Sequence, residues 1–175
     1  MKTTITPKKI NLTSNPKISL LNGFILLFFS ILSTSITYAQ NTCNAILIVE
    51  DNGNVDSASQ EGVTYKMTFT NNGFSAETYT LSAININSIC KNPDESAANK
   101  NVILSTQFLD SNKNKITEIT IEPGESIHFL TKLTIPVGTT LARWSCNQIV
   151  ATAKNCTSYK VDTTLHTYVL NPNNE

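Results

Sequence analysis

The stretch Val63-Thr64-Tyr65-Lys66-Met67-Thr68-Phe69-Thr70 alternates apolar and polar residues. A period of two places Val63, Tyr65, Met67 and Phe69 on one face of a strand and the polar residues on the other face. The next residues, Asn71-Asn72-Gly73, are typical of a turn, and residues 78–86 alternate again. This region therefore predicts two antiparallel strands that bury one face.

The same pattern recurs along the chain, and we find no helical periodicity beyond Gln40. Glu122-Pro123-Gly124-Glu125 predicts a type II turn, because glycine readily accepts the positive φ that this turn needs. Seven or eight short strands with frequent turn signals favour an all-β antiparallel sandwich over a barrel. Residues 87–100 are the longest irregular insertion. The further strands are expected at residues 45–50, 102–109, 116–121, 126–135, 148–153 and 161–170.

The first 39 residues resemble an export signal. Four lysines between residues 2 and 17 precede an uncharged, mostly apolar run at residues 18–36. Thr37-Tyr38-Ala39 then supplies small residues at positions −3 and −1 of a cleavage site before Gln40. Two interpretations stay open, a cleaved signal peptide and an uncleaved membrane anchor, since a run of this length just spans a bilayer. Both export residues 40–175 as one domain, and only the N-terminal segment would touch a membrane.

The exported part is mildly acidic. Residues 40–175 hold nine Lys and Arg against thirteen Asp and Glu, which gives a formal net charge of −4. A nucleic-acid partner would require clustered basic residues, and the sequence has no basic stripe. We therefore expect no nucleic-acid partner, and we find no motif that indicates a cofactor.

Three groups of motifs resemble bacterial Ig-like surface modules. The first is Tyr65-Lys-Met-Thr-Phe-Thr-Asn-Asn-Gly73 followed by Thr78-Tyr-Thr-Leu-Ser82. The second is Ile119-Thr-Ile-Glu-Pro-Gly-Glu125 followed by Leu133-Thr-Ile-Pro-Val-Gly138, and the third is Ile149-Val-Ala-Thr-Ala153. These segments are similar to CARDB-type adhesion-related domains, the NPCBM-associated sandwich and the repeats of large surface proteins.

The resemblance covers most of residues 45–170 and implies an Ig-like sandwich without catalytic residues. Such modules are spacers, stalks and binding platforms. The resemblance therefore implies a secreted, periplasmic or cell-surface binding or structural module, with a protein or a glycan as its partner. This chain differs from the family pattern because it holds one copy and four cysteines.

Cys43, Cys90, Cys146 and Cys156 all lie in the exported part, and an even number there predicts two disulfides. The geometry disfavours a bond between Cys146 and Cys156, because the ten extended residues that separate them span roughly 30 Å. In the Ig-like strand order that the resemblance implies, the compatible pairs are Cys43–Cys156 and Cys90–Cys146. The spacings lack the paired cysteines of a zinc site, neither histidine is expected nearby, and we expect no metal.

Five further residues bear on function. Trp144 is interpreted first as a ring packed beside a disulfide, and alternatively as the centre of a carbohydrate-binding module. His128 and His166 are expected on solvated strand faces, and a small hydrolase built on either is the least favoured alternative, because no nucleophile elbow occurs. Ser57 and Thr163 follow aspartates in short patterns that resemble bacterial O-glycosylation sites.

Overall fold

The computed structural model describes residues 43–156 and 158–172. All described residues belong to one compact unit. The predicted export signal at residues 1–39 lies outside the described residues. Within the described part of the chain, no helix is long and apolar enough to cross a membrane.

The described residues form an all-β structure of ten strands with two short 3₁₀ helices. The strands are β1 (Ala45–Val49), β2 (Val55–Ala58), β3 (Val63–Asn71), β4 (Glu77–Asn85), β5 (Ser105–Leu109), β6 (Lys115–Ile116), β7 (Glu118–Ile121), β8 (Ser126–Thr134), β9 (Arg143–Ala153) and β10 (Lys160–Val169). The 3₁₀ helices are η1 (Glu50–Asn52) and η2 (Ala98–Lys100).

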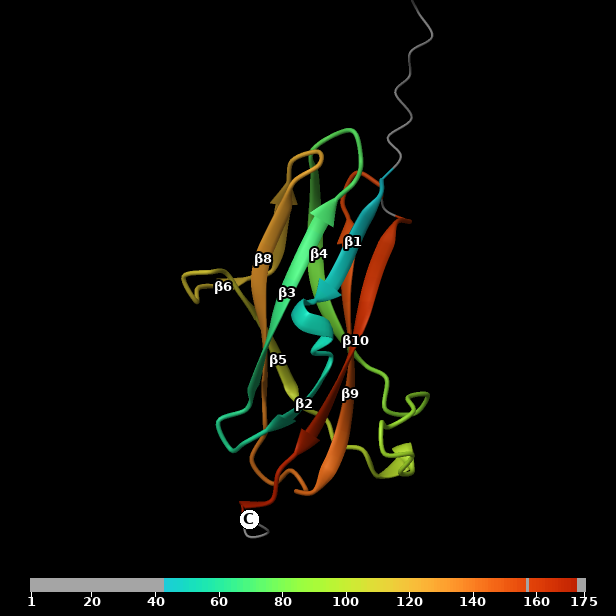
Figure 1. Cartoon of the computed structure of the whole chain (residues 1–175), viewed down its shortest axis with the longest axis vertical. Coiled ribbons are helices and arrows are strands. Elements are labelled where there is room, and N and C mark those ends of the chain that lie inside the picture. Colours follow the sequence, from blue (N-terminus) through green and yellow to red (C-terminus); the bar gives the residue numbers. More distant parts are fainter. Residues whose placement is uncertain (1–42, 157, 173–175) are drawn as a thin grey trace, which may run out of the picture. The chain divides into compact units, whose positions relative to one another are not determined.

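The strands form two five-stranded sheets that pack as a sandwich (Figure 1). One sheet has the order β1-β3-β8-β5-β6 and the other has the order β2-β10-β9-β4-β7. All strand pairs are antiparallel except β2 with β10, which run parallel. This arrangement confirms the expected Ig-like sandwich. It also makes β9 a central strand, paired with β10 on one side and β4 on the other.

The predicted alternation fills the core. Met67 and Phe69 of β3 are fully buried, and the Phe69 ring meets the Tyr79 ring of β4 edge to face, with centroids 4.6 Å apart. Since β3 and β4 belong to different sheets, this contact joins the two layers. Tyr65 adds a polar link, because its hydroxyl lies 2.7 Å from Thr167 Oγ1 of β10. Burial raises the pKa of Tyr65 to about 12.

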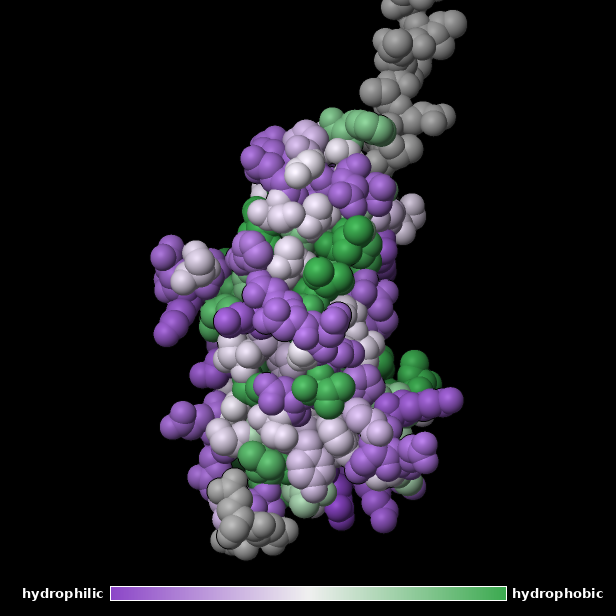
Figure 2. Space-filling model, viewed as in Figure 1, coloured by the Kyte–Doolittle hydropathy of each residue, from purple (hydrophilic) through white to green (hydrophobic). Residues whose placement is uncertain are grey.

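On the outside, apolar side chains are scattered. Ile46 and Ile48 of β1 are each 50% exposed. Figure 2 shows green patches over the region of β1, separated by polar side chains. Single exposed apolar residues are common on soluble proteins, so this face indicates no particular partner.

Three strand predictions need correction. Residues 55–58 were not among the expected strands but form β2, which has no apolar alternation and pairs only with the end of β10. The predicted strand 148–153 begins earlier, at Arg143, because its polar residues pair with β10. The predicted strand 116–121 is divided between two sheets, as β6 and β7.

Two turn glycines have positive φ for different reasons. Gly124 has φ +76° in the predicted Pro-Gly turn, where Glu125 N donates to Glu122 O at 3.1 Å, and a Cβ there would meet no atom within 4 Å. Gly62 has φ +91° between β2 and β3, and a Cβ there would overlap the Leu133 carbonyl oxygen. Gly62 is therefore required by close approach as well as by conformation.

These two glycines make a matched pair of variants. We expect Gly124→Ala to lower the free energy of unfolding by about 1 kcal/mol, because only the positive φ is penalised. Gly62→Ala should lower it by about 3 kcal/mol or more, because the new methyl group also displaces β8. Urea denaturation of both variants measures the difference. Equal losses would contradict the close approach at Gly62.

Candidate functional site

Residues 86–104 connect β4 to β5 and continue along β9 where β4 ends. Ile86 N donates to Cys146 O at 3.1 Å, and Val102 N donates to Trp144 O at 2.8 Å. Asn87 completes this attachment, since its Oδ1 accepts from Cys146 N at 2.8 Å and its Nδ2 donates to Val102 O at 2.9 Å. Both ends of the segment are therefore bonded to the first residues of β9.

A pair of side-chain amides closes the segment on itself. Asn92 Nδ2 donates to Asn101 Oδ1, and Asn101 Nδ2 donates to Asn92 Oδ1, both at 2.8 Å. Asn92 is 5% exposed, so its polar atoms depend on these bonds and on the bond from Nδ2 to Ser96 O. The reciprocal bonds fix the two arms of the loop against each other.

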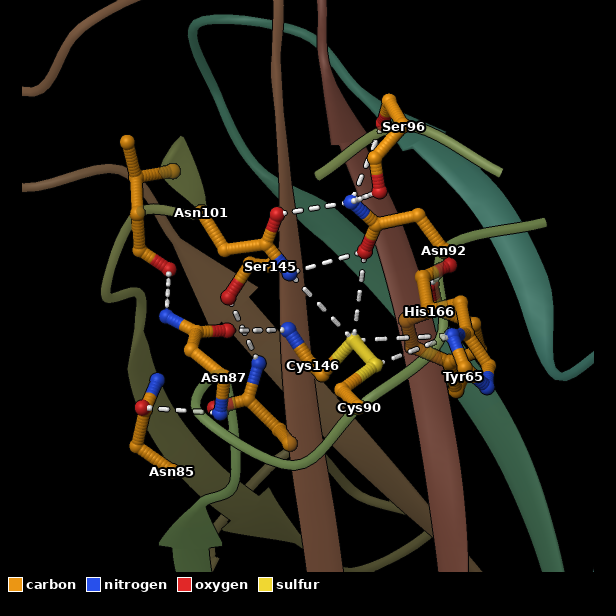
Figure 3. The surroundings of a disulfide bond; sticks show 12 residues. Tyr65, Asn85, Asn87, Cys90, Asn92, Ser96, Asn101, Ser145, Cys146 and His166 are labelled. Carbon is orange, nitrogen blue, oxygen red and sulfur yellow. Dashed lines mark hydrogen bonds between the residues drawn. A yellow bond between two sulfur atoms is a disulfide. The ribbon is translucent and has the colours of Figure 1, made fainter. Parts of the chain in front are cut away.

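The disulfide Cys90–Cys146 ties this segment to the outer face of β9, with the Cα atoms 6.3 Å apart (Figure 3). His166 lies directly opposite Cys146 in the β9–β10 register. Its Nδ1 is 3.5 Å from Cys146 Sγ and 3.6 Å from Cys90 Sγ. The expectation that His166 is a solvated residue distant from the cysteines is therefore wrong, because residues 86–104 cover it. This burial lowers the pKa of His166.

The second disulfide, Cys43–Cys156, lies beyond the other end of β9, with the Cα atoms 6.4 Å apart. Its neighbour is an acid. Glu77 Oε2 lies 3.4 Å from Cys43 Sγ. Glu77 is 4% exposed, and its Oε1 accepts bonds from Thr78 N, Asn155 N and Asn155 Nδ2. The two disulfides are the pairs expected from the Ig-like strand order.

Each disulfide and its neighbour form a group of three potential metal ligands. Cysteine binds a metal as a thiolate. In each group the two cysteines form a disulfide with each other, so neither sulfur is a thiolate. Each group then keeps one donor, His166 or Glu77, which is fewer than a transition-metal site needs.

A pocket of about 280 Å³ lies where residues 94–101 face the start of β9 and the end of β10. Its rings are Trp144 and Tyr168, which meet edge to face with centroids 5.1 Å apart. Its charged residues are Asp94, Lys100 and Arg143. Trp144 thus shares the outer face of β9 with Cys146, while the ring that packs on it is Tyr168.

The Trp144 indole has an unused donor. Within the described residues, no acceptor lies at hydrogen-bonding distance from its buried Nε1. The indole nevertheless lies close enough to Asp94 to be the largest of the causes that lower the pKa of that carboxyl. The pocket therefore offers aromatic surface and charges of both signs.

His128 lies on the opposite sheet, where its side chain is 70% exposed. His128 Nδ1 contacts Glu50 Oε1 at 2.7 Å and Thr68 Oγ1 at 3.1 Å. The hydrogen bond from His128 is the main cause that lowers the pKa of Glu50. A nucleophile–base–acid relay needs the hydroxyl and the carboxylate on different ring nitrogens. Here both groups meet Nδ1, so this cluster lacks the geometry of a hydrolase triad.

The predicted O-glycosylation positions lie on the strands at one edge. Ser57 is exposed on β2, and Thr163 is half-buried on β10. Modification of either residue stays a prediction.

The sequence pointed to Trp144 and to all four cysteines. It did not point to Tyr168, Asp94 or Lys100 as neighbours of Trp144, and it did not place His166 beside a disulfide. For His166 and Tyr168 the sequence holds one signal, the alternation that places both residues on the same face of β10.

The fold and this pocket define an Ig-like β-sandwich with a loop-built pocket on the outer face of one sheet. No protein-family model and no curated protein matches the sequence. Among solved structures, the chain is similar to a FixG-related protein from Vibrio parahaemolyticus, with 13% identity and a TM-score of 0.45, over 73% of this chain and 95% of that chain.

Two further solved structures are similar over 74% of this chain. A family 123 glycoside hydrolase from Clostridium perfringens has 14% identity and a TM-score of 0.47, over 27% of its own length. The E. coli chaperone DraB has 9% identity and a TM-score of 0.42, over 56% of its own length. At these identities the similarities concern the β-sandwich and say nothing of function.

Asn87→Ala tests how residues 86–104 are held. The variant leaves the Cys146 N–H and the Val102 carbonyl without their amide partner, so we expect the free energy of unfolding to fall by about 2 kcal/mol or more. Asn85→Ala is the matched control, because Asn85 is exposed and its Oδ1 accepts only a 3.3 Å bond from Asn87 N. The control should change the free energy by about 0.5 kcal/mol or less. Urea denaturation measures both, and equal effects would contradict the bridging role of Asn87.

Proposed function

We propose that this chain is an exported, non-catalytic binding module of a bacterial cell surface or periplasm. The observation that carries the proposal is the pocket of Asp94, Lys100, Arg143, Trp144 and Tyr168, which is built by an ordered polar loop. A domain that serves only as a spacer has no need of this loop, since residues 94–101 contribute no side chain to the apolar core. Exposed loops positioned by a rigid scaffold are common binding elements.

Export is supported by two independent features. Residues 18–36 form the apolar run of an export signal, and all four cysteines pair as disulfides. Structural disulfides form and persist in oxidising compartments. The proposed mature domain is residues 40–175, or the whole chain if the apolar run stays as an anchor.

The intact mass of the chain expressed in a bacterium distinguishes these forms. We expect an exported product that starts at Gln40 and gains four hydrogens on reduction, because signal cleavage follows Ala39 and two disulfides open. A product that keeps residues 1–39 in the membrane fraction would indicate the anchored form. A reduced product that stays in the cytoplasm would contradict export.

The chemistry of the pocket favours a carbohydrate as its ligand. Sugar rings present C–H faces that pack on aromatic side chains, and their hydroxyls pair with carboxylates. Trp144 and Tyr168 supply the rings, and Asp94 supplies the carboxylate. Lys100 and Arg143 add two cations, so a sugar that carries an acidic group gains a charged partner.

A binding role without catalysis is supported by the surroundings of the histidines. His128 meets Thr68 and Glu50 through one nitrogen, and His166 faces a disulfide. Neither arrangement activates a nucleophile.

Trp144 is the sole tryptophan, so its fluorescence reports on the pocket directly. We expect at least one member of a panel of neutral, amino and uronic sugars to shift this fluorescence. Calorimetry on that sugar should show affinity losses of about tenfold or more for Trp144→Ala and Tyr168→Ala, because stacking surface is removed.

Phe74→Ala is the matched aromatic control. Phe74 is 88% exposed on the turn between β3 and β4, away from the pocket, and this variant should bind like the parent. Absence of a fluorescence response to every sugar, or unchanged affinity in Trp144→Ala, would overturn the carbohydrate assignment.

A further inference from the structure

The two disulfides have opposite chemical surroundings. Cys90–Cys146 is faced by nitrogens: His166 Nδ1 lies 3.5 Å from Cys146 Sγ, and Asn101 Nδ2 donates to the same sulfur at 3.6 Å. Asn92 Oδ1 lies 3.7 Å away and suits a protonated thiol. Cys43–Cys156 is faced by the Glu77 carboxylate at 3.4 Å. N–H donors stabilise a thiolate, whereas a carboxylate beside a sulfur disfavours one.

The two sulfurs of Cys90–Cys146 also differ in access. Cys146 is fully buried, whereas Cys90 is partly exposed. Cys90 lines an open hollow of about 520 Å³ together with Lys91, Asn92, Pro93, Glu95 and Ser96. An attacking thiolate approaches a disulfide along the S–S axis and must reach one sulfur. The hollow admits such a reagent to Cys90. Asn101 donates to Cys146 only, and His166 Nδ1 lies within 3.6 Å of both sulfurs (Figure 3).

We propose that Cys90–Cys146 is a thiol-exchangeable disulfide, in which an incoming thiolate attacks Cys90 and the thiolate of Cys146 leaves into hydrogen bonds from His166 and Asn101. The substrate class is a small thiol or an exposed protein thiol outside the cytoplasm. Cys43–Cys156 is the inert structural disulfide of the same domain. This proposal does not depend on what the Trp144 pocket binds.

The exchange balances as two steps. The thiolate RS⁻ forms a bond to Cys90 Sγ, the Sγ–Sγ bond breaks, and its electron pair stays on Cys146 Sγ. With the proton of His166 on Nδ1, the imidazole N–H donates to this thiolate, which later takes a proton from water. A second thiolate attacks the sulfur of R, releases Cys90 as a thiolate and leaves as RSSR. In total, two thiols are oxidised to one disulfide, and the protein disulfide is reduced to two thiols.

The experiment treats the purified native chain with reduced glutathione, blocks free thiols with iodoacetamide at successive times, and maps the four cysteines by mass spectrometry. We expect Cys90 and Cys146 to be labelled about tenfold faster than Cys43 and Cys156, because a stabilised leaving thiolate departs faster. Glutathione should be found on Cys90 and not on Cys146. Equal rates, faster labelling of Cys43 and Cys156, or glutathione on Cys146 would each overturn the proposal.

Variants on each side separate chemistry from folding. His166→Phe should slow the reduction of Cys90–Cys146 about tenfold, because the leaving thiolate loses a donor, and His166→Gln should recover part of the rate through its amide N–H. Glu77→Gln should speed the reduction of Cys43–Cys156 and leave Cys90–Cys146 unchanged. If His166→Phe instead speeds the reduction of both disulfides, the substitution has loosened the fold. That result would contradict a chemical role for His166. Thermal unfolding of each variant measures that loosening.

Discussion

The attachment of residues 86–104 to β9 is the constraint on which the pocket and the disulfide environment both depend. This segment buries only two side chains, Asn92 and Leu104, so apolar packing alone cannot hold it in place. Its order instead comes from side-chain amides, main-chain bonds to β9 and one covalent tie at Cys90. A buried amide is costly unless its partners are present, so the bonds of Asn92 favour the arrangement that satisfies them.

The sandwich itself was predictable because alternation records which face of a strand is buried. Tyr65, Met67 and Phe69 were expected on one face of β3, and all three are buried. The turn at Gly124 was predictable for a similar local reason, since a Pro-Gly pair fits few backbone conformations. Pairs of cysteines followed from strand order, because an Ig-like sandwich fixes which strand ends share a pole.

Other features depend on contacts that the sequence does not record locally. Residues 55–58 have no apolar alternation, and they form β2 only because the end of β10 offers a free edge. The start of β9 is polar at Arg143, Ser145 and Asn147, yet it is a strand, since β10 pairs along its whole length. His166 was placed on the correct outer face of β10, but the loop that buries it begins eighty residues earlier. Tertiary cover of this kind overrides what a single strand predicts.

Contacts between residues distant in sequence also explain why the cysteines predict the two disulfides but not the reactivity of each disulfide. A disulfide's reactivity is decided by the groups that face its sulfurs in either redox form. Those groups come from strands distant in sequence from the cysteines: Glu77 from β4 and His166 from β10. Cys43–Cys156, which contacts the Glu77 carboxylate, joins the start of β1 to the residues after β9. Its loss would free edge strand β1 from this attachment. Cys90–Cys146, which contacts His166 Nδ1 and Asn101 Nδ2, joins a surface loop to β9. Cys90 lies in a loop, so exchange at that second position would free a loop from β9, whereas opening Cys43–Cys156 would free the start of β1.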